Sequence, residues 1–193
     1  LELRKDYLES EDIETIYLGG GTPSQLTKRE LKEIFASIYH LYKVKGNAEI
    51  TFEANPDDLT PEYLTMLSQL PINRISMGIQ TFDDATLRIL NRRHTEQIAR
   101  MATMRLREKG FQNISIDLMY GLPGETIEQW ENDLQQAIAL NVEHISAYHL
   151  TYEEGTPLYR RLQQGEVSEV SEELSLTFFN MLIDALTKAD YQH

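Results

Sequence analysis

Ile16-Tyr17-Leu18-Gly19-Gly20-Gly21-Thr22-Pro23-Ser24 is the stretch on which the fold depends. Its first three residues form an apolar run typical of a β-strand. The three glycines that follow lack a Cβ atom, so the backbone can turn sharply and approach a ligand closely. Pro23 has no N–H group and cannot continue a central strand. The stretch therefore predicts that a strand ends at Leu18 and that a binding site begins there.

Strands and helices alternate along the rest of the chain. Further strands are expected at Glu49–Ala54, Ile72–Gln80, Ile114–Met119 and His144–Leu150. The helices between them begin at the capping box Thr27–Glu30, at Thr60, at Asp83 with a break over 91–94, and at Thr126; a last helix follows Gly165. Thr126 starts a helix expected to be buried along Ile127, Trp130 and Leu134. Such alternation predicts an α/β fold of parallel βα units, closed as a barrel or open as a doubly wound sheet.

Glu53, Gln80 and Asp117 stand at three successive strand ends, where ligands bind in both architectures. Side chains alternate between the two faces of a strand, so Glu53 lies opposite Ile50 and Phe52, which pack against helices. A buried carboxylate there needs donors, and ligand hydroxyl or ammonium groups would supply them. For each residue alone a structural ion pair explains the pattern equally well, but three in succession favour a binding site.

The glycine turn and Arg92 each allow two interpretations. Gly19–Thr22 exposes backbone N–H and C=O groups that suit a carboxylate, ammonium or phosphate group, but a plain tight turn explains it equally well. It is not a Walker A loop, because no Gly-Lys-Ser/Thr follows, and no G-x-G-x-x-G motif is present. Arg92 belongs to a solvated helix face, or it binds a ligand carboxylate with two of its nitrogens.

Composition narrows the class of protein. The 193 residues are enough for one domain spanning 1–193, and 41% hydrophobic content is typical of a globular protein. The net charge of −13 disfavours nucleic acid as a partner. No apolar run approaches the ~20 residues of a transmembrane helix, and no leader sequence is evident, so a cytoplasmic location is expected. Without cysteine, these residues form no disulfide and no thiolate-held metal site.

Four motifs, in order, resemble those of the oxygen-independent coproporphyrinogen III oxidase family, including its haem-chaperone relatives. They are Gly19–Ser24, Glu53–Pro56, Ser76–Phe82 and Asp117–Gly124. Each is weak alone, but four at matching strand ends make the resemblance specific, and it covers most of the chain. It implies a radical S-adenosylmethionine (SAM) protein with a partial (β/α)6 TIM-like barrel. In that family a [4Fe-4S] cluster cleaves SAM reductively to a 5′-deoxyadenosyl radical.

The same resemblance implies which residues bind SAM. Gly20, Gly21 and Thr22 would hold its methionine end, and Arg92 its carboxylate. The ribose region would be contacted by Glu53, Gln80 and Asp117, while Met119 and Thr151 would frame the adenine. Side-chain alternation along the strands and the resemblance therefore both assign Glu53, Gln80 and Asp117 to the mouth of the sheet.

The chain departs from the family in lacking the C-x3-C-x2-C cluster loop. Leu1–Glu11 is charged and helix-prone with no start signal, so it is interpreted as the tail of a first helix. The expectation is a fragment truncated at the first βα unit, with the cluster cysteines upstream of Leu1 and further chain beyond His193. Such a piece alone would not assemble the cluster or perform radical chemistry.

Within the family the motifs divide between two branches. Gly121–Thr126 and Glu154–Tyr159 resemble the haem chaperones, whereas Asn91-Arg92 resembles the oxidase, because the chaperones usually carry Gly-Arg. The chaperone branch is favoured. Expected partners are a porphyrin or haem, an electron-donor protein, and further copies of the chain through an exposed barrel edge. The alternatives are a true oxidase, a non-radical lyase or hydrolase using Glu53 and Asp117, and a non-catalytic binding module.

Overall fold

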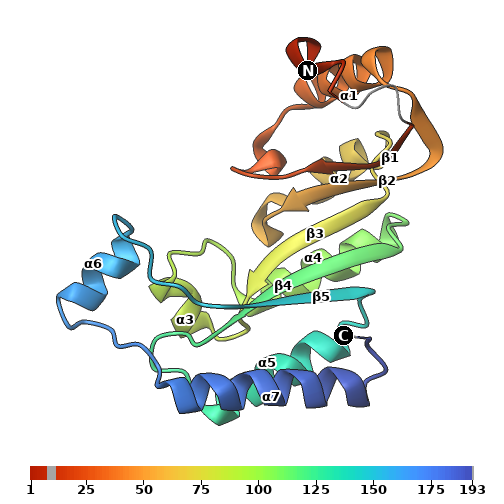
Figure 1. Cartoon of the computed structure of the whole chain (residues 1–193). Helices are drawn as coiled ribbons and strands as arrows, with labels where there is room; N and C mark the ends of the chain where they lie inside the picture. Colours follow the sequence, from red (N-terminus) through yellow and green to blue (C-terminus); the bar gives the residue numbers. More distant parts are fainter. Residues whose placement is uncertain (8–11, 193) are drawn as a thin grey trace.

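The computed structural model describes residues 1–7 and 12–192. Five parallel strands form one sheet in the order β1-β2-β3-β4-β5 (Figure 1). They are β1 (Ile13–Leu18), β2 (Val44–Ala54), β3 (Arg74–Gln80), β4 (Asn113–Tyr120) and β5 (His144–His149). Each strand therefore pairs with its neighbour in sequence, as in a (β/α) barrel. The sheet is a half-barrel, which confirms the predicted α/β fold and partial TIM-like barrel.

Helices connect these strands and follow the last one. They are α1 (Lys28–Leu41), α2 (Pro61–Leu67), α3 (Asp84–Ile89), α4 (Glu96–Glu108), α5 (Ile127–Ala139), α6 (Pro157–Gln163) and α7 (Glu172–Lys188), with 3-10 turns η1 (Glu2–Arg4), η2 (Pro23–Gln25) and η3 (Pro56–Asp58). The capping box predicted before α1 is present, because Thr27 and Glu30 bond each other's backbone N–H groups. The predicted break between α3 and α4 is also present.

The two faces of the sheet differ in polarity. Ile75, Met77 and Ile79 of β3 are fully buried in the core that the helices cover. Ser76 lies between two of them in sequence and Gln80 follows the last, and both line the interior of the half-barrel. The inner face is polar also on β2 and β4, where Thr51 and Ser115 are buried. The interior of the half-barrel is therefore lined by polar side chains.

Helices α5 and α7 pack side by side against the sheet beyond β5 (Figure 1). Trp130 of α5 is fully buried, and its indole N–H donates to the backbone oxygen of Phe178 at 2.9 Å. The expected burial of Ile127 is wrong: this residue is 44% exposed because it is the first of the helix, one turn before the packed face begins.

Three expected segments differ from those observed. Strand β2 begins at Val44 rather than Glu49, because pairing with β1 extends it beyond the alternating stretch. No helix is predicted between β5 and Gly165, but the connection contains the seven-residue α6, which starts at Thr156-Pro157 and has no fully buried residue. Of the helix expected over Leu1–Glu11, Glu2–Arg4 is a 3-10 turn, and residues 8–11 lie outside the described residues.

Candidate functional site

A cleft of about 180 Å³ opens at the carboxyl ends of strands β1 to β4. Its walls come from the loop after β1, the ends of β2, β3 and β4, and the residue Arg92 after α3. Six of the nine predicted site residues line it: Gly21, Thr22, Glu53, Gln80, Arg92 and Asp117. The cleft therefore lies where the strand-end argument predicted a ligand site.

The turn after β1 requires glycine for two different reasons. Gly20 and Gly21 have φ angles of 71° and 70°, in the left-handed region that strains residues with a side chain. At Gly19 the constraint is space: a Cβ atom would lie 2.5 Å from the Tyr17 ring and 2.8 Å from the Glu53 carboxylate. A side chain at Gly19 would therefore displace Glu53.

Two groups hold the Glu53 carboxylate. The Tyr17 hydroxyl donates to Oε1 at 2.7 Å, and the Gly20 backbone N–H donates to Oε2 at 3.0 Å. Burial and the hydrogen bond to Glu53 raise the pKa of Tyr17 to about 12, so its hydroxyl remains a donor at neutral pH. A carboxylate has about four acceptor positions, so Glu53 can still accept ligand hydroxyl groups.

Gln80 ends β3 in an uncommon backbone conformation, with φ of 72°. The chain just after this bend is fixed by Asp133 of α5, whose carboxylate accepts the Phe82 N–H at 2.9 Å. Burial raises the pKa of Asp133 to about 6. Close approach also requires Gly78, where a Cβ atom would lie 2.8 Å from the amide nitrogen of Gln80 and 2.9 Å from Nη2 of Arg92.

Arg92 is a half-buried cation on the wall of the cleft. Its Nη2 donates to the backbone oxygen of Gly78 at 2.9 Å, while Nε is buried without a protein partner. Burial lowers the pKa of this guanidinium. The chain reaches this position through Asn91, whose φ of 56° is tolerated better by Asn and Gly than by other residues. An unpartnered buried donor favours an anionic ligand group nearby.

Asp117 faces the cleft between neighbouring strands, beside Gly78 on β3 and Ser146 on β5. Burial raises the pKa of Asp117; a hydrogen bond with Ser146 lowers it, and the charge of Glu53 raises it further. The cleft therefore combines two carboxylates with one guanidinium. This donor and acceptor set suits a ligand that carries hydroxyl or ammonium groups together with a carboxylate.

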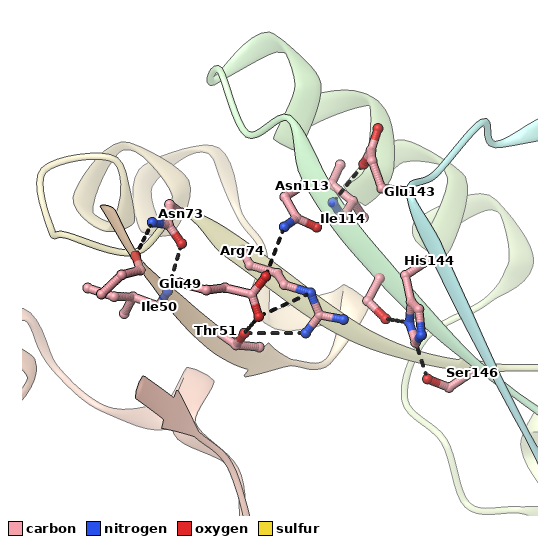
Figure 2. A network of polar contacts seen from close by, with 12 residues as sticks. Glu49, Ile50, Thr51, Asn73, Arg74, Asn113, Ile114, Glu143, His144 and Ser146 are labelled. Atoms are coloured by element: carbon pink, nitrogen blue, oxygen red, sulfur yellow. Dashed lines mark hydrogen bonds and ion pairs between the residues drawn. The ribbon is translucent and has the colours of Figure 1, made fainter. Parts of the chain in front are cut away.

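A second polar group of residues lies on the inner face nearer the amino ends of the strands (Figure 2). Arg74 reaches the Thr51 hydroxyl at 3.3 Å and lies 4.0 Å from Glu49 (Figure 2). On the neighbouring strands, His144 Nδ1 lies 2.8 Å from the Ser115 hydroxyl. These side chains bond to one another across neighbouring strands, so we assign this region a role in supporting the inner face rather than in ligand binding.

The other three predicted residues do not line the cleft. Gly20 lies next to it and holds Glu53. Met119 is beside Tyr148 of β5, and Thr151 is exposed just after that strand, so their expected contact with adenine remains a prediction. Tyr17 was missed, although strand phase could have found it, since it alternates with Ile16 and Leu18, which pack against the core.

Some kinds of site are absent from the described part of the chain. Residues 1–7 and 12–192 contain no group of three or more His, Cys, Asp or Glu side chains that could hold a metal ion. Over the same residues, no helix is both long and apolar enough to span a membrane.

The half-barrel with a polar cleft at its strand ends is the architecture of a (β/α)-barrel protein, with a candidate site for a small polar ligand. The chain belongs to the radical SAM superfamily, whose family model matches residues 1–137. This finding confirms the radical SAM type of the predicted barrel.

Two curated relatives are heme chaperones. The chain is 37% identical over 185 residues to the heme chaperone HemW of Lactococcus lactis, covering 96% of this chain and 49% of that protein. With the Bacillus subtilis heme chaperone HemW it shares 37% identity over 176 residues, 91% of this chain and 46% of that one. The chain thus spans about half the length of these curated relatives. Their similarity confirms the resemblance to the haem-chaperone relatives of the oxidase family.

Solved structures agree on the fold. Coproporphyrinogen III oxidase (HemN) from Escherichia coli matches with a TM-score of 0.82 and 26% identity, covering 98% of this chain and 45% of that one. Elp3 from Methanocaldococcus infernus matches with a TM-score of 0.77 over 95% of this chain and 48% of that chain, at 19% identity, and shows the fold alone.

Membership of this superfamily implies SAM and a [4Fe-4S] cluster. The cleft fits SAM, because the unpartnered Nε of Arg92 suits its carboxylate and the carboxylates of Glu53 and Asp117 suit ribose hydroxyl groups. The cluster does not fit these residues, since its ligands are cysteine thiolates and the 193 residues contain none.

Proposed function

We propose that residues 1–193 form the SAM-binding core of a radical SAM protein that acts in haem metabolism as a haem chaperone. One observation carries this proposal: the 37% identity to the Lactococcus lactis heme chaperone HemW extends over 96% of the chain. That similarity therefore includes the strand ends that build the cleft. Residues 1–193 are proposed to act as one domain.

The methionine end of SAM would bind at the wall made by Gly20, Gly21 and Thr22, with its carboxylate at Arg92. Two observations support this. Gly20 and Gly21 have the positive φ angles of a tight turn whose Gly21 and Thr22 line the cleft, and Arg92 Nε is buried without a partner. Both features favour a ligand with charged groups at this end of the cleft.

The ribose would contact Glu53, Gln80 and Asp117, and the adenine would lie between Met119 and Thr151. Glu53 is already oriented by Tyr17 and Gly20, so its remaining acceptor positions are fixed before a ligand arrives. Bound SAM supplies the radical chemistry of the superfamily. The residues of this chain would bind it and orient it.

Other components belong to the proposal through family membership. The cluster would be held by cysteines outside these 193 residues, and an electron-donor protein would reduce it. Haem or a porphyrin would be the physiological ligand, and the protein would work in the cytoplasm. The radical SAM family match favours a SAM-binding role for Glu53 and Asp117 over the acid and base of a non-radical lyase.

A coproporphyrinogen III oxidase is the second candidate, because the Escherichia coli oxidase HemN shares the fold at 26% identity. Asn91 had suggested the oxidase, but its left-handed backbone suits Asn and Gly alike. That position therefore does not separate the two functions.

The test uses the intact protein, purified without oxygen and carrying its cluster. Titration with haem, followed by absorbance, is expected to give saturable binding, and incubation with SAM, a reductant and coproporphyrinogen III is expected to release no CO₂. Decarboxylation of coproporphyrinogen III would establish the oxidase instead. Absence of both haem binding and decarboxylation would contradict a role in haem metabolism.

A further inference from the structure

Asp58 gathers donors from separate parts of the chain just behind the cleft. Its side chain is only 8% exposed. Oδ2 accepts the Ser24 hydroxyl at 2.6 Å, and Oδ1 accepts the Gln25 amide at 2.7 Å and Arg93 Nη2 at 2.9 Å. Oδ2 also accepts the Asn55 side-chain amide at 3.4 Å, from the same loop as Asp58. Four donors on one carboxylate, one of them a guanidinium, form a charge-assisted cluster.

The members of this cluster stand on three different loops. Ser24 and Gln25 follow β1, Asp58 follows β2, and Arg93 follows α3. Each loop also contributes to the wall of the cleft, through Thr22–Ser24, Asn55 and Arg92 respectively. Asp58 does not line the cleft itself, so any influence on a ligand acts through these loops.

The cluster remains charged at neutral pH. Burial alone would raise the pKa of Asp58, but the hydrogen bonds from Ser24, Gln25 and Arg93 outweigh burial and leave the pKa below its ordinary value. Nη2 of Arg93 also lies 2.9 Å from the Asp57 carboxylate, so this one nitrogen pairs with two carboxylates of the loop after β2. The side chain next to Arg92 in sequence is therefore anchored to the loop after β2.

We propose that Asp58 is a positioning residue for the methionine end of SAM. By tying the loop after β1 and the residue after Arg92 to the loop after β2, it sets the glycine turn and Arg92 at the separation that this end of the ligand requires. The inference rests on the proposed SAM-binding function. It adds a residue that acts on one half of the ligand without touching it.

The experiment compares two ligands in the intact, cluster-containing protein by calorimetry. SAM carries the methionine end, whereas 5′-methylthioadenosine has only the nucleoside and a methylthio group. Asp58→Ala is expected to weaken SAM about ten-fold while leaving 5′-methylthioadenosine within about two-fold. Asp58→Asn keeps the volume and one acceptor oxygen, and it is expected to give an intermediate loss for SAM alone.

Glu143→Gln is the matched control. Glu143 also pairs with an arginine, Arg107, at 2.8 Å and accepts the Ile114 N–H at 2.8 Å, but near the amino ends of the strands. It should leave both affinities unchanged. Equal losses for the two ligands, or unchanged SAM affinity in both Asp58 variants, would overturn the positioning role. If the unmodified protein binds neither ligand, the proposed function itself fails, and this inference fails with it.

Discussion

Glu53 links the glycine turn to the chemistry of the cleft. Its carboxylate needs the Gly20 N–H, and Gly20 can present that N–H only because its backbone adopts a left-handed conformation. The absence of a side chain at Gly19 leaves the space that the carboxylate occupies. Gly19 and Gly20 are therefore required by the position of the Glu53 carboxylate.

Gly19→Ala should destabilise the protein by about 1–3 kcal/mol, because the new Cβ atom would overlap Tyr17 and Glu53. Gly46→Ala in β2 is the control: nothing lies within 4 Å of its added Cβ atom, and its φ is not positive. The control should change the unfolding free energy by less than about 1 kcal/mol. Urea denaturation of both variants measures the difference, and equal stabilities would contradict the close packing at Gly19.

Glu125 should make stability depend on pH. Its carboxylate accepts the N–H groups of Gly121 and Leu122 at 2.7 and 3.0 Å, and burial raises the pKa of Glu125 to about 7. Because that pKa exceeds the ordinary value of 4.5, the folded protein holds this proton more tightly than the unfolded chain. The contribution to the unfolding free energy is therefore fully present below about pH 4.5 and is lost as pH rises to about 7.

Glu125→Gln should flatten this dependence, removing a slope of at most about 1.4 kcal/mol per pH unit. Urea denaturation at about pH 5 and about pH 7 tests it. Glu131→Gln, on the exposed side of α5, should retain the slope of the unmodified protein. A slope unchanged in Glu125→Gln would mean that Glu125 does not titrate in this range.

Among the elements, those with local signals were predictable. The capping box at Thr27 and the Thr60-Pro61 start gave α1 and α2, and strand phase gave Glu53 and Asp117. Helix α6 was missed because it is only seven residues long, too short for its apolar residues to show a clear helical period. The Asp58 cluster was missed because its bonds join residues 34 and 35 positions apart, which only tertiary packing brings together.

Trp130 anchors α5 to α7. It is fully buried and bonds the backbone of Phe178, so Trp130→Ala should lower the unfolding free energy by about 3–5 kcal/mol through loss of packing. Ile127→Ala on the same helix should cost far less, because Ile127 is 44% exposed. Thermal or urea unfolding compares the two, and similar losses would mean that α7 is not held through Trp130.

At the scale of the whole molecule, the sheet has two edges, β1 and β5. No described strand pairs with the outer edge of β1, and exposed strand edges favour pairing with another chain. The 193-residue chain is therefore expected to self-associate through this edge. Light scattering should give a mass above 22.4 kDa that falls on dilution. A mass of 22.4 kDa at every concentration would contradict association.

The central claim is that the cleft at the strand ends binds SAM through Glu53 and Asp117. Calorimetry of the intact protein with SAM tests it most directly. Glu53→Gln and Asp117→Asn should each weaken binding about ten- to a hundred-fold, as expected for a lost hydrogen bond to a charged group. Glu49→Gln, on the same strand and inner face but outside the cleft, should bind as the unmodified protein does. Unchanged affinity in both cleft variants would contradict the account.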